Sequence, residues 1–437
     1  MKTIAIVGFG FCGKIIFSHL AKSSEKKYRI LIFNKADQGL ESVAFADFSP
    51  HYILNVPANK MSAFSADEKD FCNFLQKNYP KIFNEIGEFG FAPRQIYQQY
   101  LQEIFLESLV IAKKNKLDFS LINQEVLKVQ KNNSTEEFLI KTKEKNFSVD
   151  QIILATSVIQ SNFAPQILKN ITSKFDQNYF IKNLWHKNYL NFHQEKIAQK
   201  KICLIGSGLS AVDVIVGLKN KNFTGKIFVV ARRGNFPKKH FIEAPKNINF
   251  ISVADAKKGI VFLCLKIRYF LRANSEFDLR HVVDSIRSIT QNLWQNFDQK
   301  NKKLFLRLLP YWNIFRHRAP ISSIEIIEKM IASKQLEIKK GGLKSAVKLD
   351  GKFLIETKFE KFECDYLVNC LGFEFDAKKY ALLNQMIEED LLKPDLMMVQ
   401  SNHEKIHLLG GLNIGKDFEC TSVPDLRADV EKLIKIL

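Results

Sequence analysis

Two glycine-rich turns carry the residue spacing that binds the phosphates of a dinucleotide. Residues 8–13 read Gly-Phe-Gly-Phe-Cys-Gly, and residues 206–211 read Gly-Ser-Gly-Leu-Ser-Ala. In such a turn the first glycine allows the tight bend, and the second lets backbone N–H groups approach the pyrophosphate. A small third residue lets the helix pack closely on the strand. One such motif alone is a weak signal, so the elements around each copy decide its meaning.

Each turn lies between an apolar run and a segment with helical spacing, and a second apolar run follows. These three segments are residues 3–7, 14–21 and 29–33 for the first turn, and 202–205, 212–218 and 227–233 for the second. Strand, turn, helix and strand in this order predict two β-α-β units. We therefore expect an α/β fold with two Rossmann-like dinucleotide-binding domains. The expected cofactor contacts in the turns are Gly8, Gly10, Gly13, Gly206, Gly208 and Ser210.

The ends of the two second strands indicate which dinucleotide each unit takes. Asn34 stands where an acidic residue usually holds the ribose hydroxyls, and it can still accept such a hydrogen bond; an ordinary loop residue is the alternative. Arg232 and Arg233 end the other strand, and guanidinium groups suit a 2′-phosphate, which favours NADPH over NADH. The alternative is that both arginines are merely exposed cations.

Composition limits the class of protein. The chain has 437 residues, of which 46% are hydrophobic and 25% charged, so a globular protein with two domains is expected. Its formal net charge is +19, but lysine is scattered through every segment and no basic run alternates with aromatic residues. A solvated basic surface is therefore favoured over binding to nucleic acid.

Cysteine usage and hydropathy bear on the compartment. The seven cysteines never form a C-x-x-C pair, which indicates a reducing compartment and argues against a zinc site or a vicinal redox disulfide. Residues 259–270 are apolar, but they are too short and too charged to span a bilayer. A buried helix is favoured there over a helix on a membrane surface. We expect a cytoplasmic protein with no membrane span and no metal.

The remaining segments supply the other elements of the predicted fold. Helical spacing occurs at residues 70–78 and 93–114, and residues 255–330 look mainly helical. Alternating or apolar runs predict strands at 125–129, 138–142, 147–149, 151–155, 353–357, 359–364, 366–372 and 406–409. A glycine turn at Gly410 and Gly411 precedes a closing helix over residues 424–437.

Residues in many separate segments agree, in order along the chain, with the pattern of one flavoprotein family. Besides the two turns they are residues 54–58, Met61, Ser62, residues 91–94, Tyr97, Tyr100, Leu101, residues 232–234, Pro237, His240, residues 281–284 and 310–320, Glu419, Thr421, Pro424 and Arg427. On these residues the chain resembles the two-dinucleotide flavoproteins that include bacterial FAD-dependent urate hydroxylases and the L-aspartate N-monooxygenases that form nitrosuccinate.

The resemblance implies a particular use of the two units. The first would bind FAD and the second NAD(P)H, with the second domain inserted into the first. The FAD domain would comprise residues 1–180 and 363–437, and the NAD(P)H domain residues 181–362, with a helical insertion at 255–330. The resemblance adds these cofactor contacts: Asn55, Val56 and Pro57 against the flavin, Met61 and Ser62, and Gly410, Gly411 and Thr421 closing the FAD site.

The sequence departs from the family pattern after the second strand. Residues 39–45 lack most of the glycines that the family has there. The pyrophosphate turn at residues 8–13 is complete, so we expect FAD binding to be kept.

Two dinucleotide cofactors in one chain imply electron transfer from the nicotinamide to the flavin. Disulfide reductases pass the electrons to paired cysteines, and this chain has no such pair. Oxygen is the remaining common acceptor. The expected reaction is hydroxylation of a small polar or anionic nitrogen-containing substrate by a flavin hydroperoxide in a dry pocket. The alternatives are an NAD(P)H oxidase or reductase without hydroxylation, and a non-catalytic FAD-binding interaction protein.

Cationic side chains in the helical insertion and nearby loops are the candidates for substrate binding, because they could orient an anionic substrate by charge-assisted hydrogen bonds. They are Arg94, His240, His281, Arg287, His317 and Arg318. For each residue alone, a surface or core role is the alternative, and no general base is assigned. His317 with Arg318, between a tryptophan and a proline, is the preferred pair.

Overall fold

The computed structural model describes residues 1–23, 28–35, 42–45, 51–132, 134–163, 167–169, 179–185, 197–241 and 248–437. The chain divides into two units, each assembled from separate segments. Unit 1 comprises Met1–Asp47, Val56–Ile159 and Glu374–Leu437, and unit 2 comprises Phe48–Asn55 and Gln160–Phe373. One domain is thus interrupted by the other, as the sequence predicts.

The boundaries between the units differ from the predicted domain boundaries at residues 180 and 362. The strands β8 (Leu168–Lys169) and β9 (Phe180–Ile181) pair with strands of unit 2, and so does β16 (Tyr366–Asn369). Residues 160–180 and 363–373 therefore belong to unit 2. The short segment 48–55 also belongs to unit 2, which the sequence did not indicate.

A five-stranded parallel sheet forms the centre of unit 1. Its strands are ordered β19 (Ile406–Leu408), β7 (Gln151–Leu154), β1 (Lys2–Val7), β2 (Tyr28–Phe33) and β3 (Asp118–Ile122). The apolar side chains of β1 from Ile4 to Val7 are at most 5% exposed. Such a continuous apolar run is typical of a parallel strand that is covered on both faces.

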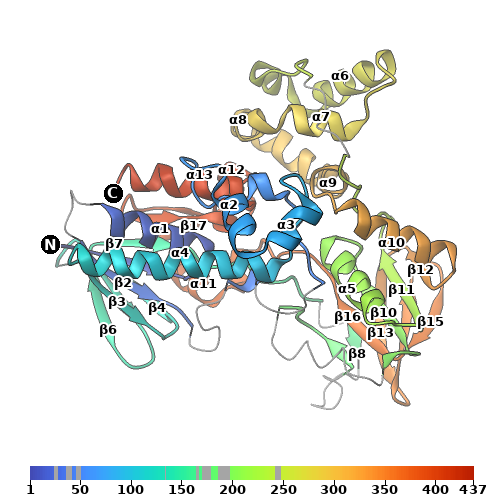
Figure 1. Cartoon of the computed structure of the whole chain (residues 1–437), viewed down its shortest axis with the longest axis horizontal. Coiled ribbons are helices and arrows are strands. Elements are labelled where there is room, and N and C mark those ends of the chain that lie inside the picture. Colours follow the sequence, from blue (N-terminus) through green and yellow to red (C-terminus); the bar gives the residue numbers. More distant parts are fainter. Residues whose placement is uncertain are drawn as a thin grey trace. The chain divides into compact units, whose positions relative to one another are not determined.

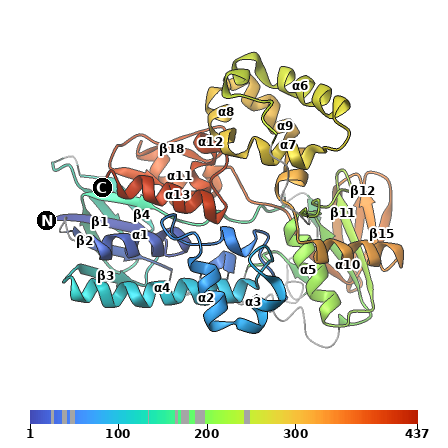
Figure 2. The ribbon, with the colours of Figure 1, turned by 45° about the horizontal axis from the view of Figure 1, so that its top comes forward.

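Helices and a small β ribbon cover this sheet. The helices α1 (Phe11–Lys22) and α4 (Arg94–Lys114) run side by side, and α13 (Val423–Ile434) packs beside α1 (Figures 1 and 2). The antiparallel ribbon consists of β4 (Lys128–Lys131), β5 (Phe138–Lys141) and β6 (Asn146–Val149). It contacts the sheet through an edge-to-face pair of Phe33 and Phe147, whose ring centroids are 5.2 Å apart.

The shorter elements of unit 1 connect these layers. They are η2 (Val43–Phe45), η3 (Ala58–Lys60), α2 (Asp70–Asn78), α3 (Pro80–Ile86), η10 (Ala377–Lys379), α11 (Ala381–Glu388), β17 (Leu392–Pro394), β18 (Val399–Ser401), η11 (Gly410–Asn413) and α12 (Ile414–Asp417).

Unit 2 is built on a second five-stranded parallel sheet. Its strand order is β12 (Leu336–Lys340), β11 (Lys226–Ala231), β10 (Lys201–Ile205), β16 and β9. The helices α5 (Leu209–Asn220) and α10 (Ile321–Ala332) pack against each other (Figure 1). A second sheet, with the order β15 (Lys361–Cys364), β14 (Lys352–Thr357), β13 (Leu343–Leu349) and β8, shares a buried core with the first.

A helical insertion separates β11 from α10 and β12 along the chain. It contains η8 (Val253–Lys258), α6 (Gly259–Ala273), α7 (Leu279–Ser285), η9 (Arg287–Ile289), α8 (Thr290–Asn296) and α9 (Gln299–Arg316). The prediction that residues 259–270 form a buried helix is wrong in one respect. The segment is helical, but Val261, Leu265 and Tyr269 are 60%, 46% and 68% exposed. The reason is that α6 is apolar on both of its faces and only one of them packs on the insertion.

The predicted fold class is confirmed, since each glycine turn joins a strand to a helix and then to a parallel strand. The predicted helices at residues 70–78 and 93–114 and the ribbon over 125–149 are also confirmed, with ends shifted by a few residues. The strand β3 and the helix α3 were not predicted. Of the altered segment 39–45, residues 39–41 lie outside the described part of the chain, and Val43–Phe45 form η2.

Candidate functional site

The turn after β1 in unit 1 has a steric requirement for glycine at its first position. Gly8 has a φ of +101°, and its N–H group donates a hydrogen bond of 2.9 Å to the carbonyl oxygen of Phe33. A Cβ atom at this position would lie 2.6 Å from the carbonyl oxygen of Ala155. Both the backbone conformation and the neighbouring strand therefore exclude other residues.

The second glycine of this turn is open, in contrast to the first. Gly10 is extended, and a Cβ atom added there would have the Ser42 hydroxyl oxygen, at 3.9 Å, as its nearest neighbour. Helix α1 begins at the next residue and has no acidic residue in its first turn. The first N–H groups of a helix have no carbonyl partner within the helix. At the start of α1 they lie beside open space that suits an anionic phosphate. Gly13 is tightly packed against the Gly8 carbonyl oxygen, 2.3 Å from where its Cβ would be.

The turn after β10 in unit 2 repeats this arrangement. Gly206 has a φ of +107°, and its N–H group donates a hydrogen bond of 2.9 Å to the Val230 carbonyl oxygen. A Cβ atom at this position would lie 2.5 Å from the Cys370 carbonyl oxygen, which is too close. A Cβ at Gly208 would have no neighbour within 4 Å. Helix α5 begins at the following residue, again without an acidic first turn, and Ser210 is its half-buried second residue. Both turns therefore fit the phosphates of a dinucleotide.

The residues after the second strands take different positions. Asn34 is half-buried, and its N–H group donates 3.0 Å to the Ile122 carbonyl oxygen at the end of β3. Arg232 and Arg233 are exposed, and the guanidinium carbon of Arg233 lies 4.5 Å from the centroid of the Tyr311 ring. Such stacking holds a guanidinium group in place while leaving its N–H groups free to bind an oxyanion.

The loop that contains Met61 and Ser62 is stabilised by hydrogen bonds within the loop and by two side chains of unit 1, Tyr100 and Arg427. Met61 and Ser62 are buried, and the Ser62 hydroxyl forms hydrogen bonds with the carbonyl oxygens of residues 64 and 67. Arg427 donates 3.0 Å from Nη1 to the Ser62 carbonyl oxygen, and the Tyr100 hydroxyl accepts 3.0 Å from the Ala63 N–H group. In this structure Met61 and Ser62 shape the loop, and their contact with a cofactor remains a prediction.

The predicted C-terminal glycine turn belongs to the same edge of the unit 1 sheet as the phosphate turn, because β19, β7 and β1 are parallel. Gly411 lies against the segment that follows β7, so a Cβ there would be 2.5 Å from Cγ1 of Val158. Thr421 is exposed before α13. Open α/β sheets bind ligands at this carboxyl edge. In the same loop region, Val56 and Pro57 begin a segment of unit 1, whereas Asn55 ends a segment of unit 2.

Two of the predicted substrate residues, His281 and Arg318, meet at the ring of Phe241 in unit 2. His281 packs on the Phe241 ring with centroids 4.3 Å apart, and the Arg318 guanidinium carbon lies 5.4 Å from the same ring. Arg280 also lies over this ring, at 4.2 Å. We call Phe241, Arg280, His281, Asp284 and Arg318 the Phe241 cluster.

Arg318 is the most enclosed cation of the cluster. The residue is 8% exposed, and its Nη2 atom lies 2.5 Å from Oδ1 of Asp284. Its Nε and Nη1 atoms are buried and have no hydrogen-bond partner among the described residues. An unpaired buried donor costs about 1–3 kcal/mol, so two such donors on one guanidinium group point to an acceptor that belongs there.

Asp278 and its neighbours fix the start of α7 beside this cluster. Asp278 caps the helix, and its N–H group donates 3.1 Å to Nδ1 of His281. Arg280 donates 2.9 Å from Nε to the Asp278 carboxylate and 3.1 Å from Nη1 to the Lys239 carbonyl oxygen. Burial opposes ionisation of Asp278, but the hydrogen bonds from Arg280 outweigh it and lower the pKa of the carboxyl group.

His240 joins two segments of unit 2. Its Nε2 atom lies 3.0 Å from the carbonyl oxygen of Asn55, and because a carbonyl oxygen only accepts, Nε2 carries the proton. Its backbone N–H group donates to the Ala319 carbonyl oxygen at 3.1 Å. The residue predicted to touch the flavin and a predicted substrate residue are thus in direct contact.

The other three predicted substrate residues lie elsewhere. Arg94 is the first residue of α4 and belongs to unit 1. Arg287 is the first residue of η9, and His317 follows the last residue of α9. All three are half-buried.

Several residues of these sites were not predicted from the sequence. Asp284, Phe241 and Arg280 were not among the candidates, although the spacing Asp-x-x-His at 278–281 is that of a capping box and marks the start of α7. Lys14 was also missed. It follows the third glycine, is 1% exposed, and places Nζ 3.5 Å from the Ser42 hydroxyl oxygen. A cation next to a phosphate turn was the available signal.

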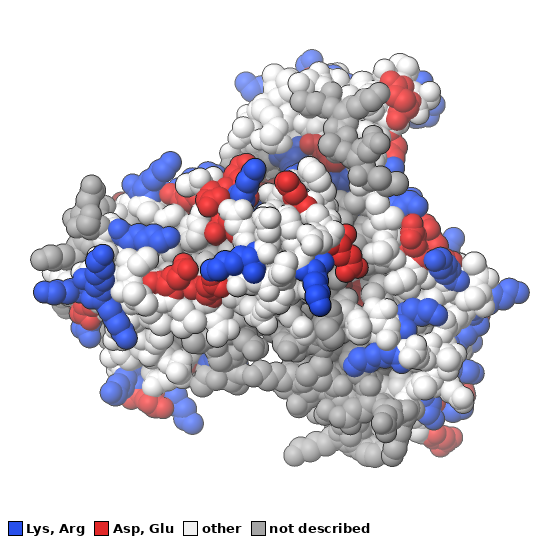
Figure 3. All heavy atoms as spheres, viewed as in Figure 1, with Lys and Arg blue, Asp and Glu red and all other residues white. Residues whose placement is uncertain are grey.

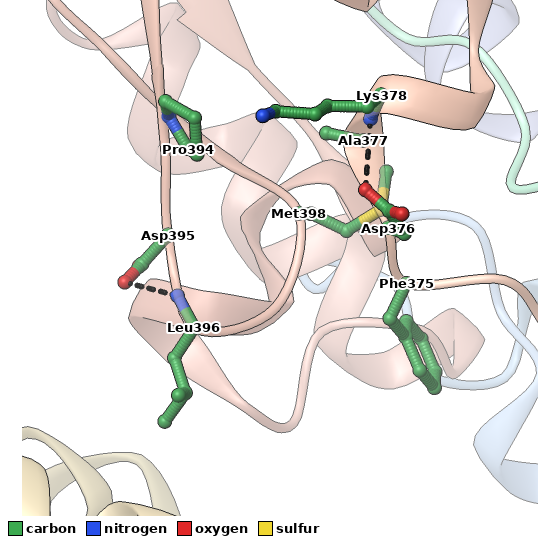
Figure 4. A pocket seen from close by; sticks show the side chains of 8 residues that line it. All are labelled: Phe375, Asp376, Ala377, Lys378, Pro394, Asp395, Leu396 and Met398. Carbon is green, nitrogen blue, oxygen red and sulfur yellow. Dashed lines mark hydrogen bonds between the residues drawn. The ribbon is translucent and has the colours of Figure 1, made fainter.

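A cavity of about 300 Å³ lies in unit 1, between η10 and the β17–β18 hairpin (Figure 4). The Asp395 carboxylate accepts 2.7 Å from the Leu396 N–H group and 2.7 Å from Nε2 of Gln400, and Asp376 accepts 3.1 Å from the Lys378 N–H group. Both carboxylates therefore form hydrogen bonds that stabilise the loops to which they belong. None of the residues predicted to bind a cofactor or substrate lines this cavity.

The surface and the ionisable groups restrict other kinds of site. On the face shown in Figure 3, Lys and Arg side chains are scattered with Asp and Glu between them. Within the described ranges, no group of three or more His, Cys, Asp or Glu could hold a metal ion. In the same part of the chain, no helix has the length and apolar character needed to cross a membrane.

The fold and the two turns define a protein with two dinucleotide-binding units. Residues 5–158 match the protein-family model described as FAD-NAD(P)-binding. No curated protein matches the chain in sequence.

Solved structures share the fold over the whole chain. The ornithine N-hydroxylase of Kutzneria sp. 744, solved with reduced FAD, NADP+ and L-ornithine, has a TM-score of 0.63 at 13% identity and covers 99% of this chain and 98% of its own. The ornithine hydroxylase of Pseudomonas aeruginosa has a TM-score of 0.63 at 14% identity, with 100% and 98% covered. The bacillithiol disulfide reductase of Staphylococcus aureus has a TM-score of 0.55 at 13% identity, also with 100% and 98% covered.

Proposed function

We propose that the chain is an FAD-dependent, NAD(P)H-consuming monooxygenase that hydroxylates a small nitrogen-containing substrate. The observation that carries this proposal is the presence of one phosphate-binding turn in each unit, both built in the same way and both open at the second glycine. Two such turns in one chain suit a nicotinamide cofactor that reduces a flavin. Two of the fold neighbours described above are N-hydroxylating or hydroxylating enzymes by name.

The residues of unit 1 would hold FAD. Gly8, Gly10 and Gly13 with the N-terminus of α1 would bind its pyrophosphate, and Asn34 its ribose. Val56 and Pro57, which follow the unit 2 residue Asn55 in the predicted flavin loop, would surround the ring system together with the Gly410 and Gly411 turn and Thr421. Bound FAD supplies the redox chemistry, and the protein supplies placement and exclusion of water.

The residues of unit 2 would hold the reductant. Gly206, Gly208 and Ser210 at the start of α5 would bind the pyrophosphate of the nicotinamide cofactor. Arg232 and Arg233 are exposed after β11, where a 2′-phosphate would lie, so NADPH is the expected reductant.

The cysteines do not support a disulfide reductase. Six of the seven are buried, and the exception is Cys264 on α6. Burial raises the pKa of the Cys370 thiol, and burial with a hydrogen bond that the Cys203 thiol donates to Cys364 raises the pKa of Cys203. Thiols held protonated in a core are poor nucleophiles for disulfide exchange, which leaves oxygen as the acceptor of electrons from the flavin.

The Phe241 cluster is the proposed substrate site. Arg318 would bind an acidic group of the substrate through Nε and Nη1, with Asp284 positioning the guanidinium group from its other side. His240 and His281 would line the same region. No residue is proposed as a general base.

Rapid mixing with and without oxygen tests the proposed reaction. Anaerobic NADPH should bleach the absorbance of the bound flavin. In air, a panel of amino acids, amines and purines should contain a compound that yields a hydroxylated product and suppresses release of hydrogen peroxide. Peroxide formation that no compound suppresses would instead identify an NAD(P)H oxidase. A flavin that NADPH does not bleach would contradict any enzymatic role of this kind.

Arg318→Ala should raise the KM for the compound found in this way by about 30-fold, because a buried charge-assisted hydrogen-bond pair is worth roughly 2 kcal/mol. The rate of flavin reduction by NADPH should stay unchanged. Arg307→Ala, an exposed arginine of the same insertion, is the matched control. An equal KM for both variants would remove Arg318 from the substrate site.

A further inference from the structure

The outward side of α6 is an exposed apolar surface with basic residues at one end. Its residues recur at helical spacing and are Val261, Cys264, Leu265, Arg268, Tyr269 and Arg272, all exposed. We call them the α6 outer face. Neighbouring apolar residues on an exposed helix face commonly mark a place where another surface binds.

The orientation of this face is fixed by the other side of the helix. Ile260 and Leu263 are 6% and 5% exposed and point inward. The Phe270 ring stacks on Phe250 with centroids 4.0 Å apart and an interplanar angle of 9°. Turning α6 to hide its outer face would break these contacts, so the apolar side chains stay at the surface of the insertion.

The charged side chains of α6 and of the two residues before it are all positive. Between Asp255 and Glu276 the chain carries five cations, which are Lys257, Lys258, Lys266, Arg268 and Arg272, and no acidic residue. Asp255 is buried and pairs with Lys266 at 2.7 Å. Arg268 and Arg272 are exposed on the outer face itself.

We propose that the α6 outer face docks the protein on an anionic lipid surface. An apolar stripe with a tyrosine, flanked by lysine and arginine and without acidic residues, has the composition of a helix that lies in a membrane interface. Anionic headgroups complement the cations, and the formal net charge of +19 adds a favourable long-range attraction. The apolar side chains enter the boundary between headgroups and acyl chains.

A second copy of the chain suits this face less well. Two copies related by a twofold axis would bring the same residues together, so Arg268 and Arg272 of both copies would be crowded at one interface. Such like charges repel, and the described residues of α6 include no acidic side chain to pair with them. The docking surface does not depend on the function proposed above.

Co-sedimentation of the full chain with vesicles tests the proposal. The protein should bind vesicles of equal parts phosphatidylglycerol and phosphatidylcholine, and salt should weaken the binding, while vesicles of phosphatidylcholine alone should bind much less. Arg268→Gln should lower the affinity by about fivefold, the effect of one basic residue near an anionic surface.

Leu265→Glu separates docking through α6 from general attraction of a basic protein. It should lower the affinity at least about tenfold and keep this effect at physiological salt. Val110→Glu is the matched control, because Val110 is a 68% exposed apolar residue on α4 in unit 1. Circular dichroism should show that both variants are folded. Equal affinity of the two variants for anionic vesicles would overturn the proposal. A wild-type chain that does not bind these vesicles would overturn it as well.

Two further readouts distinguish docking on lipid from self-association. Cys264 is the one exposed cysteine, so an environment-sensitive thiol dye should attach there and shift its emission to the blue on anionic vesicles. Analytical ultracentrifugation without lipid should give the same oligomeric state for the wild-type chain and for Leu265→Glu. Self-association that Leu265→Glu abolishes would assign the α6 outer face to a second copy and would overturn the proposal.

Discussion

The two phosphate-binding turns share one architecture. The first glycine has a φ of +101° at Gly8 and +107° at Gly206, and each donates 2.9 Å to a carbonyl oxygen of the second strand, at Phe33 and Val230. In both, a neighbouring parallel strand excludes a Cβ atom. The sheet therefore requires glycine at the first position of each turn, independently of the ligand that the unit binds.

The positions that follow differ between the turns. The third small residue is Gly13 in unit 1 and Ala211 in unit 2, and the next residue is Lys14 or Val212, both buried. After the accepting carbonyl of the second strand comes Asn34 in unit 1. The corresponding residue in unit 2 is an apolar alanine, and the arginines follow it. The strand-turn geometry is therefore common to both units, whereas the side chains around it differ, and the proposed cofactor preference rests on that difference.

Reciprocal substitutions at the second glycines should have the largest effects on cofactor affinity. Gly10 and Gly208 are extended and have room for a side chain, so valine should fold there but occupy the phosphate space. Gly10→Val should lose FAD affinity by at least about a thousandfold (~4 kcal/mol) and keep NADPH binding, and Gly208→Val should do the reverse. Calorimetric titration of each cofactor measures both. Loss of both cofactors in either variant would contradict separate sites.

The helices that pack against α1 and α5 differ in buried charge. In α13, beside α1, burial raises the pKa of the Asp429 carboxyl from 3.8 to about 6. In α10, beside α5, the buried side chains carry no ionisable group; they are Ser323, Ile324, Ile327 and Met330. The folded chain therefore holds the Asp429 proton to higher pH than the unfolded chain does. Folding stability is lost as the pH rises from about 4 to about 6 and stays lowered above that range.

Asp429→Asn should remove this loss. Relative to wild type, the variant should gain roughly 3 kcal/mol in free energy of unfolding between pH 3.5 and pH 8. Urea unfolding at the two pH values measures the change. A difference between variant and wild type that does not vary with pH would show that Asp429 is not the titrating group.

The arginines after β11 should set the preference for the reductant. Replacing Arg232 and Arg233 together by alanine should raise the KM for NADPH by about 30-fold (~2 kcal/mol) and leave that for NADH almost unchanged, because only NADPH carries the 2′-phosphate. Stopped-flow flavin reduction with each cofactor distinguishes the two. A similar rise for both cofactors would mean that the arginines act on the fold or on a shared phosphate.

Lys14 should give the smallest of these effects. Its Nζ atom approaches the Ser42 hydroxyl, which borders the open space at Gly10. Lys14→Met should weaken FAD binding by about fivefold (~1 kcal/mol). The matched control is Val212→Met at the equivalent position in unit 2, which should leave NADPH affinity unchanged. Flavin fluorescence quenching measures the first affinity, and unaltered quenching would exclude a role for the ammonium group.

Local patterns were enough to predict the strands and turns. The apolar runs before Gly8 and Gly206 and the spacing of small residues within each turn identify both β-α-β units, because these features depend on neighbours in the chain. The same holds for α4 and the antiparallel ribbon. Strand β3 was missed because its five residues alternate poorly, with only partial burial.

Features that depend on distant residues could not be predicted. Arg318 was a candidate, but its partner Asp284 is 34 residues away and no periodicity links them. The exposure of α6 was missed for a related reason. Apolar residues occur on both sides of this helix, so only tertiary packing decides which side is covered. The start of the long segment of unit 2 at residue 160 likewise depends on the pairing of β8 and β9 with later strands.

The interrupted course of unit 1 has a consequence for the order of folding during synthesis. Strand β19 pairs with β7 across more than half of the chain, and α13 packs on α1 from the far end of the sequence. A ribosome completes all of unit 2 before it makes either element. We therefore expect unit 2 to fold first, and the first glycine turn to wait with an unfinished sheet until the last segment emerges. Capture of FAD should then follow synthesis of β19 and α13.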